Sequence, residues 1–252
     1  MWIALNTILS KEIRRFMRIW QQTLLPPAIT MTLYFIIFGN LIGQRIGDMG
    51  GHSYMAFIVP GLIMMSVINN AYANVSSSFF SNKFQRSVEE MLVAPLPGWV
   101  ILLGFVAGGV ARGLMVGVIV TLVALFFTDL HLYSFWITFL TVLLSSVLFS
   151  LGGFINALYA NKFDDISIIP TFILTPLSYL GGVFYSISLL PEPWQFVSAF
   201  NPVLYMVNAF RYGILGVTDV SLTMCFSILL VLISLLTALS LRLLAKGKGI
   251  RH

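Results

Sequence analysis

Long apolar stretches fill most of the chain and are separated by short polar segments. A helix needs about 20 mainly apolar residues to cross the roughly 30 Å hydrocarbon core of a membrane. Six stretches reach that length, so the pattern predicts an all-α polytopic membrane protein with six transmembrane helices. The expected spans lie at residues 22–43, 54–80, 98–127, 133–160, 166–186 and 221–244.

A seventh apolar region, residues 188–215, is interrupted by three prolines and by Glu192 and Arg211. Proline breaks a helix in its interior, and charged side chains are costly inside hydrocarbon. We therefore expect this region to form a re-entrant pair of short helices before the sixth span, broken near Asn201-Pro202.

Residues 2–20 have the periodicity of an amphipathic helix. The basic side chains gather on one face and the aromatic and aliphatic ones on the other. Lys11, Arg14, Arg15 and Arg18 lie opposite Trp2, Leu9, Ile13, Phe16 and Trp20. This pattern is typical of a helix that lies in the membrane interface. Such a helix can serve as a membrane anchor or as a docking surface for a partner, and both interpretations remain open.

Between the second and third spans, residues 83–95 mix apolar side chains with charged ones, including Arg86, Glu89 and Glu90. This composition is compatible with a short helix at the membrane surface that ends before Pro95. It is also compatible with a plain connector.

Composition supports a membrane protein. The chain is 58% hydrophobic and only 9% charged, whereas a soluble domain is about 25% charged. Mean hydropathy is +0.95. A soluble globule is excluded, because so few charges could not cover its surface. The net charge of +5 does not indicate nucleic-acid binding, since the basic residues flank apolar stretches.

The basic residues also predict the topology. With six spans, both termini lie on one side of the membrane, and eleven of the fourteen Lys and Arg residues fall on that side. Only Arg45 and Arg211 fall on the other. Cytoplasmic loops carry the excess of Lys and Arg, so we expect both termini to be cytoplasmic.

Catalytic patterns are absent from the sequence. No serine lies in a Gly-x-Ser-x-Gly arrangement, and the three histidines have no metal-ligand spacing. None of the five lysines is followed by Ser or Thr, which a Walker A motif requires. No Asp or Glu falls inside a span, which disfavours a transporter driven by an ion gradient.

Several polar and small residues do fall inside spans. Asn70 and Asn74 share a polar stripe with nearby serines, and this stripe can serve interhelical hydrogen bonding or a water-filled path. In the third span, Gly109 and Gly113 form a seam that another helix can approach closely. Arg112, beside that seam, can act within the membrane or extend toward the interface.

Together these elements resemble the permease subunits of type-2 ATP-binding-cassette (ABC) exporters. The most specific likeness is a late pattern in which spaced aliphatic residues precede a Gly, a Leu-Pro pair, a further Pro, an aromatic residue and a basic residue. Here it reads Leu174, Leu177, Leu180-Gly181, Val183, Leu190-Pro191, Pro202, Tyr205 and Arg211.

The resemblance implies a single type-2 ABC transmembrane domain over residues 1–252, acting as the permease of an ATP-driven exporter in a bacterial inner (plasma) membrane. It implies a homodimer of this chain, surrounded by lipid, with separate ATP-binding subunits that hold ATP and Mg²⁺. The chain itself would bind no cofactor and would not be an enzyme. Residues 83–95 would form a coupling helix that contacts the ATPase, and the re-entrant helices would form an outer gate.

Two other function classes compete with this one. A gradient-driven transporter or channel would move its substrate without an ATPase. An intramembrane enzyme or an assembly scaffold would act without moving a substrate. The absence of carboxylates in the spans and of catalytic groups argues against both. The resemblance does not identify the substrate.

Overall fold

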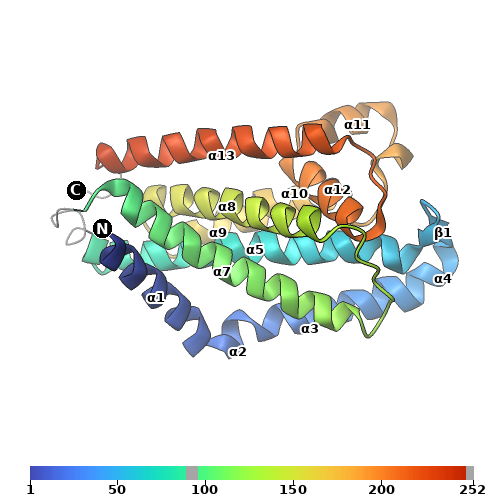
Figure 1. The fold of residues 1–252 in the computed structure, drawn as a ribbon, viewed down its shortest axis with the longest axis horizontal. Helices are drawn as coiled ribbons and strands as arrows, with labels where there is room; N and C mark the ends of the chain where they lie inside the picture. Colours follow the sequence, from blue (N-terminus) through green and yellow to red (C-terminus); the bar gives the residue numbers. More distant parts are fainter. Residues whose placement is uncertain (89–95, 248–252) are drawn as a thin grey trace.

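The structure is a computed structural model that describes residues 1–88 and 96–247. It is a bundle of long helices. The start of α1 and the end of α13 lie at the same end of the bundle (Figure 1). We call this the terminal end, and the other the opposite end. Within the described residues, five helical segments are long and apolar enough to cross a membrane. They are Trp20–Gly39, Tyr54–Phe84, Gly98–Ala124, Phe135–Tyr159 and Leu222–Ala245.

The first half of the chain begins with α1 and then a composite helix that changes winding several times. Its elements are α1 (Trp2–Arg18), α2 (Trp20–Thr23), α3 (Leu25–Tyr34), a π-helical stretch (Phe35–Ile42), α4 (Gly43–Ile46), β1 (Asp48–Met49), β2 (His52–Ser53), α5 (Tyr54–Phe84) and α7 (Gly98–Ala124). The two short strands form an antiparallel hairpin at the opposite end, a small addition to the expected all-helical fold.

The second half contains two long helices with several shorter ones between them. Its elements are α8 (Phe135–Tyr159), α9 (Asp165–Ile169), a π-helical stretch (Pro170–Leu174), α10 (Thr175–Leu180), a 3-10 turn (Ile187–Leu189), α11 (Glu192–Ala199), α12 (Pro202–Leu215) and α13 (Leu222–Ala245).

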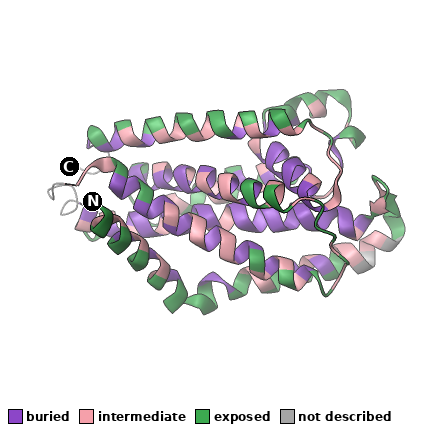
Figure 2. Cartoon of the chain, in the orientation of Figure 1, coloured by how far each residue is buried: buried purple, intermediate pink, exposed green. Residues whose placement is uncertain are grey.

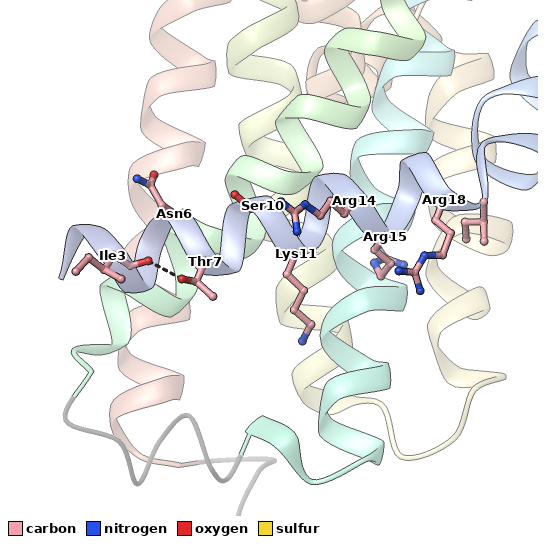
Figure 3. Close-up of a pocket in the computed structure, with 9 residues that line it drawn as sticks. Ile3, Asn6, Thr7, Ser10, Lys11, Arg14, Arg15 and Arg18 are labelled. Atoms are coloured by element: carbon pink, nitrogen blue, oxygen red, sulfur yellow. Dashed lines mark hydrogen bonds between the residues drawn. The ribbon is translucent and has the colours of Figure 1, made fainter.

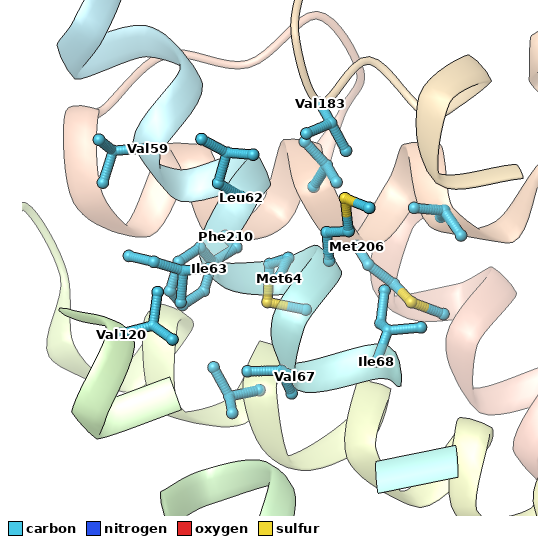
Figure 4. Packing of buried hydrophobic residues seen from close by; sticks show 14 of the residues in the cluster. Val59, Leu62, Ile63, Met64, Val67, Ile68, Val120, Val183, Met206 and Phe210 are labelled. Atoms are coloured by element: carbon cyan, nitrogen blue, oxygen red, sulfur yellow. The ribbon is translucent and has the colours of Figure 1, made fainter. Parts of the chain in front are cut away.

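Helix α5 is the centre of the bundle. It has 31 residues, a length of about 46 Å at 1.5 Å per residue. From Ala56 to Ile68 every residue is buried, because α7, α8 and α12 surround this part (Figures 1 and 2). Its side chains interleave with Val120 of α7 and with Met206 and Phe210 of α12 (Figure 4).

Glycines allow the helices around α5 to approach closely. A β-carbon added at Gly153 of α8 would lie only 2.5 Å from the carbonyl oxygen of Tyr72 on α5. The expected seam on α7 has the same function, because Gly113 lies against Ser146 of α8 and Ala71 of α5. The seam therefore packs α7 onto both neighbours.

Helix α1 lies across the terminal end and packs on another glycine face of α7. Its buried stripe consists of Ile8, Glu12 and Phe16. A β-carbon at Gly104 would lie 2.5 Å from Ile8, and one at Gly108 would lie 2.6 Å from Glu12. This stripe is therefore turned onto the protein with a carboxylate at its middle, whereas Trp2 and Trp20 of the expected apolar face remain exposed.

One expected span is shorter than the sequence pattern predicts. The continuous apolar helix runs from Asp165 to Leu180 and not over 166–186, because the chain turns at Gly181 and at Gly182, which has a φ of +72°. Its 16 residues give about 24 Å, less than the roughly 30 Å of a bilayer core. The five long helices are thus five of the six expected spans. Helices α11 and α12, with a break at Phe200–Asn201, lie at the opposite end.

The segment expected as a helix over 83–95 also begins differently. Lys83 and Phe84 belong to α5, and the chain turns at Gln85 and Arg86. Among the described residues, Arg86 is the one non-glycine residue with a positive φ, at 60°. Residues 89–95, which include Glu89 and Glu90, lie outside the part that the structure describes.

Replacing Gly153 by alanine should destabilise the protein by about 1–3 kcal/mol, because a methyl group would overpack a backbone contact that cannot yield easily. The matched control is Gly152→Ala on the same helix, where a β-carbon would make an ordinary 3.8 Å contact with Tyr72. Unfolding of both variants in detergent, followed by circular dichroism, measures the difference. Equal stability of the two variants would contradict this packing.

Candidate functional site

A row of polar residues on α5 joins this helix to α1 and α7. Residues 70, 74, 78 and 82 recur every four positions, so they follow one ridge of the helix over about 18 Å. Each side chain bonds to a charged side chain from another helix. We call Asn70, Asn74, Ser78 and Asn82 the polar row.

Three members of the row are asparagines whose side-chain oxygens accept from cations. Arg112 Nη2 of α7 donates to Asn70 Oδ1 at 2.9 Å. From α1, Arg15 Nη2 donates to Asn74 Oδ1 at 2.9 Å, and Lys11 Nζ donates to Asn82 Oδ1 at 2.6 Å. The row therefore binds three positive charges at successive levels of α5.

The Arg112 guanidinium also donates to the carbonyl oxygen of Thr23 at 3.2 Å. Thr23 lies at the bend where α2 meets α3. Arg112 therefore connects three segments, α7, α5 and this bend. Both of its partners, an asparagine side chain and a backbone carbonyl, are uncharged.

The remaining member, Ser78, donates to Glu12 Oε1 at 2.6 Å. The Glu12 side chain has no exposed surface, and its other oxygen lies 3.5 Å from Arg15 Nε. Within the described residues this is the one ion pair. A buried carboxylate needs a nearby cation and hydrogen bonds, and Glu12 has Arg15 and Ser78.

The terminal end of α5 is also attached to α8. Lys83 Nζ donates to the carbonyl oxygens of Leu158 and Ala160, both at 2.7 Å. A cation at the C-terminus of a helix stabilises its last carbonyls. After α8, the backbone N–H groups of Asn161 and Lys162 donate to Asp165 and hold the pKa of that carboxyl below its usual value.

Beside the polar row, α5 has a second face that the protein leaves open. Asn69, Ser77 and Ser81 are partly exposed and Ala73 is exposed, whereas residues 56–68 of the same helix are buried. We call these four residues the open stripe. It starts about halfway along α5 and continues toward the terminal end. The serines expected in one stripe with Asn70 and Asn74 are Ser77 and Ser81, and both lie on the open stripe and not on the polar row.

On the opposite-end side of the open stripe, aromatic rings join α3 and the π-helical stretch after it to α10 and the turn that follows. Phe38 and Phe184 lie 4.8 Å apart between ring centroids, and Tyr179 and Phe184 lie 5.7 Å apart. The hydroxyl groups of Tyr34 and Tyr179 are 3.5 Å apart. These four residues form the aromatic cluster. It brings the two helices together at the level of Gly61, where α5 is fully buried.

Arg211 of α12 is buried next to the aromatic cluster and bonds to the backbone of the same region. Its side chain is 1% exposed. Nη2 donates to the carbonyl oxygen of Gly182 at 2.6 Å, and Nε donates to that of Phe57 at 3.3 Å. The guanidinium lies 3.9 Å from the centroid of the Phe57 ring. One side chain thus holds α12, α5 and the turn after α10.

The other residues of the late sequence pattern lie in the same region. Gly181 ends α10 and faces Val203 of α12. Pro191 precedes α11, Pro202 begins α12, and the Tyr205 hydroxyl donates to the Ala199 carbonyl oxygen at 2.6 Å. The pattern therefore marks the backbone turns that position the short helices.

Sequence reasoning missed several of these residues. Glu12 was overlooked because it sits on the apolar face of an amphipathic helix, although a lone carboxylate there is itself a signal of a buried partner. Ser78 and Asn82 could have been found by extending the four-residue spacing from Asn70 and Asn74. The aromatic cluster has no comparable signal, because it forms between segments far apart in the chain.

The fold and these contacts agree with the results of sequence comparison. The profile of the family described as ABC-2 type transporter matches residues 3–215, and the chain therefore belongs to that family of membrane transport permeases. It is 61% identical over 250 residues to the inner membrane transport permease YadH of Escherichia coli K12, covering 99% of this chain and 98% of YadH. It is 24% identical over 185 residues to nodulation protein J of Rhizobium leguminosarum biovar viciae, covering 73% and 71% of the two chains. The family expected from the late sequence pattern is confirmed.

Removing Arg15 should destabilise the protein much more than removing Arg14. Arg15→Ala leaves Glu12 buried without its cation, and breaking one partner of a buried pair costs about 3–5 kcal/mol. Arg14 is exposed, so Arg14→Ala should cost less than about 0.5 kcal/mol. The free energy of unfolding in detergent measures both.

The same measurement in a Glu12→Gln background isolates the pair. In that background, Arg15→Ala should lower the free energy of unfolding by less than about 1.5 kcal/mol, because no buried charge is left without a partner. An equal cost in both backgrounds would show that Arg15 acts only through Asn74.

Proposed function

We propose that this chain is the membrane-spanning permease subunit of an ATP-driven ABC exporter, in which the open stripe of α5 lines the substrate path. The observation that carries the proposal is the contrast along α5. The helix is buried on all sides in its opposite-end half and exposes polar residues in its terminal half. This arrangement fits one side of a substrate path that is open at the terminal end and closed at the opposite end.

The excess of basic residues at the terminal end supports a cytoplasmic location for it. The open stripe then begins at the cytoplasmic side and ends at the aromatic cluster, which closes the path toward the outside. Arg211 and the short helices α11 and α12 form the support of this outer gate. On this assignment α11 and α12 are a re-entrant pair that enters the outer leaflet, and Asp165–Leu180 with the turn after it is the sixth crossing.

A second copy of this chain would complete the path. Backbone and polar groups cannot face hydrocarbon without cost, so the open stripe needs a cover that tolerates water. The helices on either side of it expose apolar surface suited to a helix interface, including Leu33 of α3, Ile37 of the π-helical stretch after it, and Phe172 and Ile173 before α10. A homodimer with the two open stripes facing each other satisfies both requirements.

Energy would come from a separate ATP-binding subunit, because the chain has no Walker A motif. Such a subunit, holding ATP and Mg²⁺, would dock at the terminal end around residues 83–95, with Arg86, Glu89 and Glu90 as contacts. Motion there would be transmitted directly, because α5 continues into this segment and is bound to α1 and α8 through the polar row and Lys83.

A gradient-driven transporter is the rival proposal, and the contacts of Glu12 bear on it. Proton- or sodium-driven transporters use carboxylates that can release and bind their ion within the membrane. The one buried carboxylate in the described residues is paired with Arg15 and Ser78 on the face of α5 that packs against α1. It is placed to hold helices together.

A cysteine at position 73 should react with charged thiol reagents added from the cytoplasmic side, because the open stripe is expected to face water. The native Cys225 is buried and can be replaced by alanine to clear the background. The control is Val231→Cys on α13, which is 58% exposed but is expected to face lipid, where a thiolate does not form. Inverted membrane vesicles provide access to the cytoplasmic side.

We expect labelling at position 73 to be at least about tenfold faster than at position 231, because reaction requires a hydrated thiolate. Equal rates would contradict a water-filled path along α5. Labelling of position 73 only from the outer side would reverse the assigned topology.

Reversing both charges at 89 and 90, in Glu89→Lys/Glu90→Lys, should weaken association with the ATP-binding subunit by about tenfold or more, because complementary charges would become repulsive. The control, Asp129→Lys/Glu192→Lys, reverses two exposed carboxylates at the opposite end. Co-purification of the ATP-binding subunit and ATP hydrolysis by the complex are the measurements. Unchanged association in the first variant would contradict docking at these residues. If the wild-type chain retains no ATP-binding subunit, the exporter proposal is wrong.

A further inference from the structure

The outward face of α1 forms a basic groove that the proposed transport mechanism does not use. It has a volume of about 780 Å³. The described residues that line it come from one face of the helix (Figure 3). They are Ile3, Asn6, Thr7, Ser10, Lys11, Arg14, Arg15, Arg18 and Ile19.

The four cations of this groove differ in what they bind. Lys11 and Arg15 are directed to α5, where they donate to Asn82 and Asn74. Arg14 and Arg18 are exposed, and neither makes an ion pair or a side-chain hydrogen bond within the described residues. Positions 14 and 18 lie one helical turn apart, so both side chains can reach a single anion.

Two hydrogen-bonding side chains continue the same ridge. Asn6, Ser10, Arg14 and Arg18 follow one another at four-residue spacing, and all four are exposed. An amide and a hydroxyl group can therefore bind further oxygens beside the two cations. Arginine is well suited to phosphate, because its planar fork of N–H groups matches two phosphate oxygens.

Exposed apolar side chains place this groove at the surface of the membrane. Trp2, the first residue of α1, and Trp20, the first residue of α2, are 79% and 50% exposed. Tryptophan concentrates at the boundary between hydrocarbon and headgroups. From Trp20 the exposed apolar surface continues through Leu25 and Ile29 into the first membrane-crossing helix. Arg14 and Arg18 therefore lie at the depth of the headgroups.

We infer that Arg14 and Arg18, with Ser10 and Asn6 beside them, form a binding site for the phosphate headgroup of an anionic phospholipid in the leaflet at the terminal end of the bundle. The lipid phosphate binds between the two guanidinium groups, and its acyl chains extend along the exposed apolar surface next to Trp20. This occupant is favoured over an acidic protein surface because the groove adjoins side chains that face lipid.

Lipid retention by the full-length chain tests the site. The purified protein is delipidated in detergent, incubated with equal amounts of phosphatidylglycerol and phosphatidylcholine, and analysed by native mass spectrometry. The test variant is Arg14→Gln/Arg18→Gln. The control variant, Arg45→Gln/Lys162→Gln, removes two exposed charges away from α1. Arg14→Lys/Arg18→Lys retains the charges, and thermal unfolding verifies that all variants are folded.

The wild type and the control should retain phosphatidylglycerol preferentially, and the test variant should lose up to about 25-fold of that preference, since each basic residue near an anionic surface contributes about a fivefold factor. The lysine variant should keep most of it. Inorganic phosphate at millimolar concentration should displace little lipid, because it lacks the acyl chains. Efficient displacement would identify a free-phosphate site instead.

Three results would overturn the proposal. The wild type could show no preference for the anionic lipid. The test variant could retain as much of the anionic lipid as the wild type does, which would indicate that the groove binds a protein partner instead. The control variant could lose as much of the preference for phosphatidylglycerol as the test variant does, which would show that lipid binding depends on the net charge of the protein and not on this site.

Discussion

Charged groups buried at the junction of α1, α5 and α7 must find their partners inside the protein, because the packed helices exclude water there. Glu12 is the strictest case, since its carboxylate has no exposed surface. Its hydrogen bond from Ser78 and the hydrogen bond from Arg15 to Asn74 fix how α1 sits on α5, and the glycine face of α7 allows the close approach of α1. Helix α1 is thus bonded to the central helix through buried polar contacts.

The central helix has two different environments along its length. Apolar packing and the aromatic cluster enclose its opposite-end half, while hydrogen bonds to cations and a partly exposed face characterise its terminal half. Packing and polarity therefore change at about the same level, near Asn69. Along the proposed substrate path, such a division would let one part exclude water while another admits it.

Much of this architecture follows from the sequence alone. The five long helices lie within a few residues of the apolar stretches that indicate them, because length and hydropathy determine a membrane helix almost by themselves. The span expected at 166–186 was too long, since hydropathy does not detect the turn at Gly181 and Gly182. Asn70 and Arg112 were recognised singly, but their contact joins residues of different helices. Pairings of that kind depend on packing geometry, which local patterns do not contain.

Both helical segments that border the open stripe contain π-helical turns, at Phe35–Ile42 and at Pro170–Leu174. In such turns the backbone hydrogen bonds span five residues instead of four. One additional residue is stored in each, and rewinding the turn as an α-helix would rotate everything beyond it by about 100°. Tyr179 and Phe184 lie beyond the second of these turns. A small local change of winding would therefore swing these rings away from Tyr34 and Phe38, with no need for the helices themselves to separate.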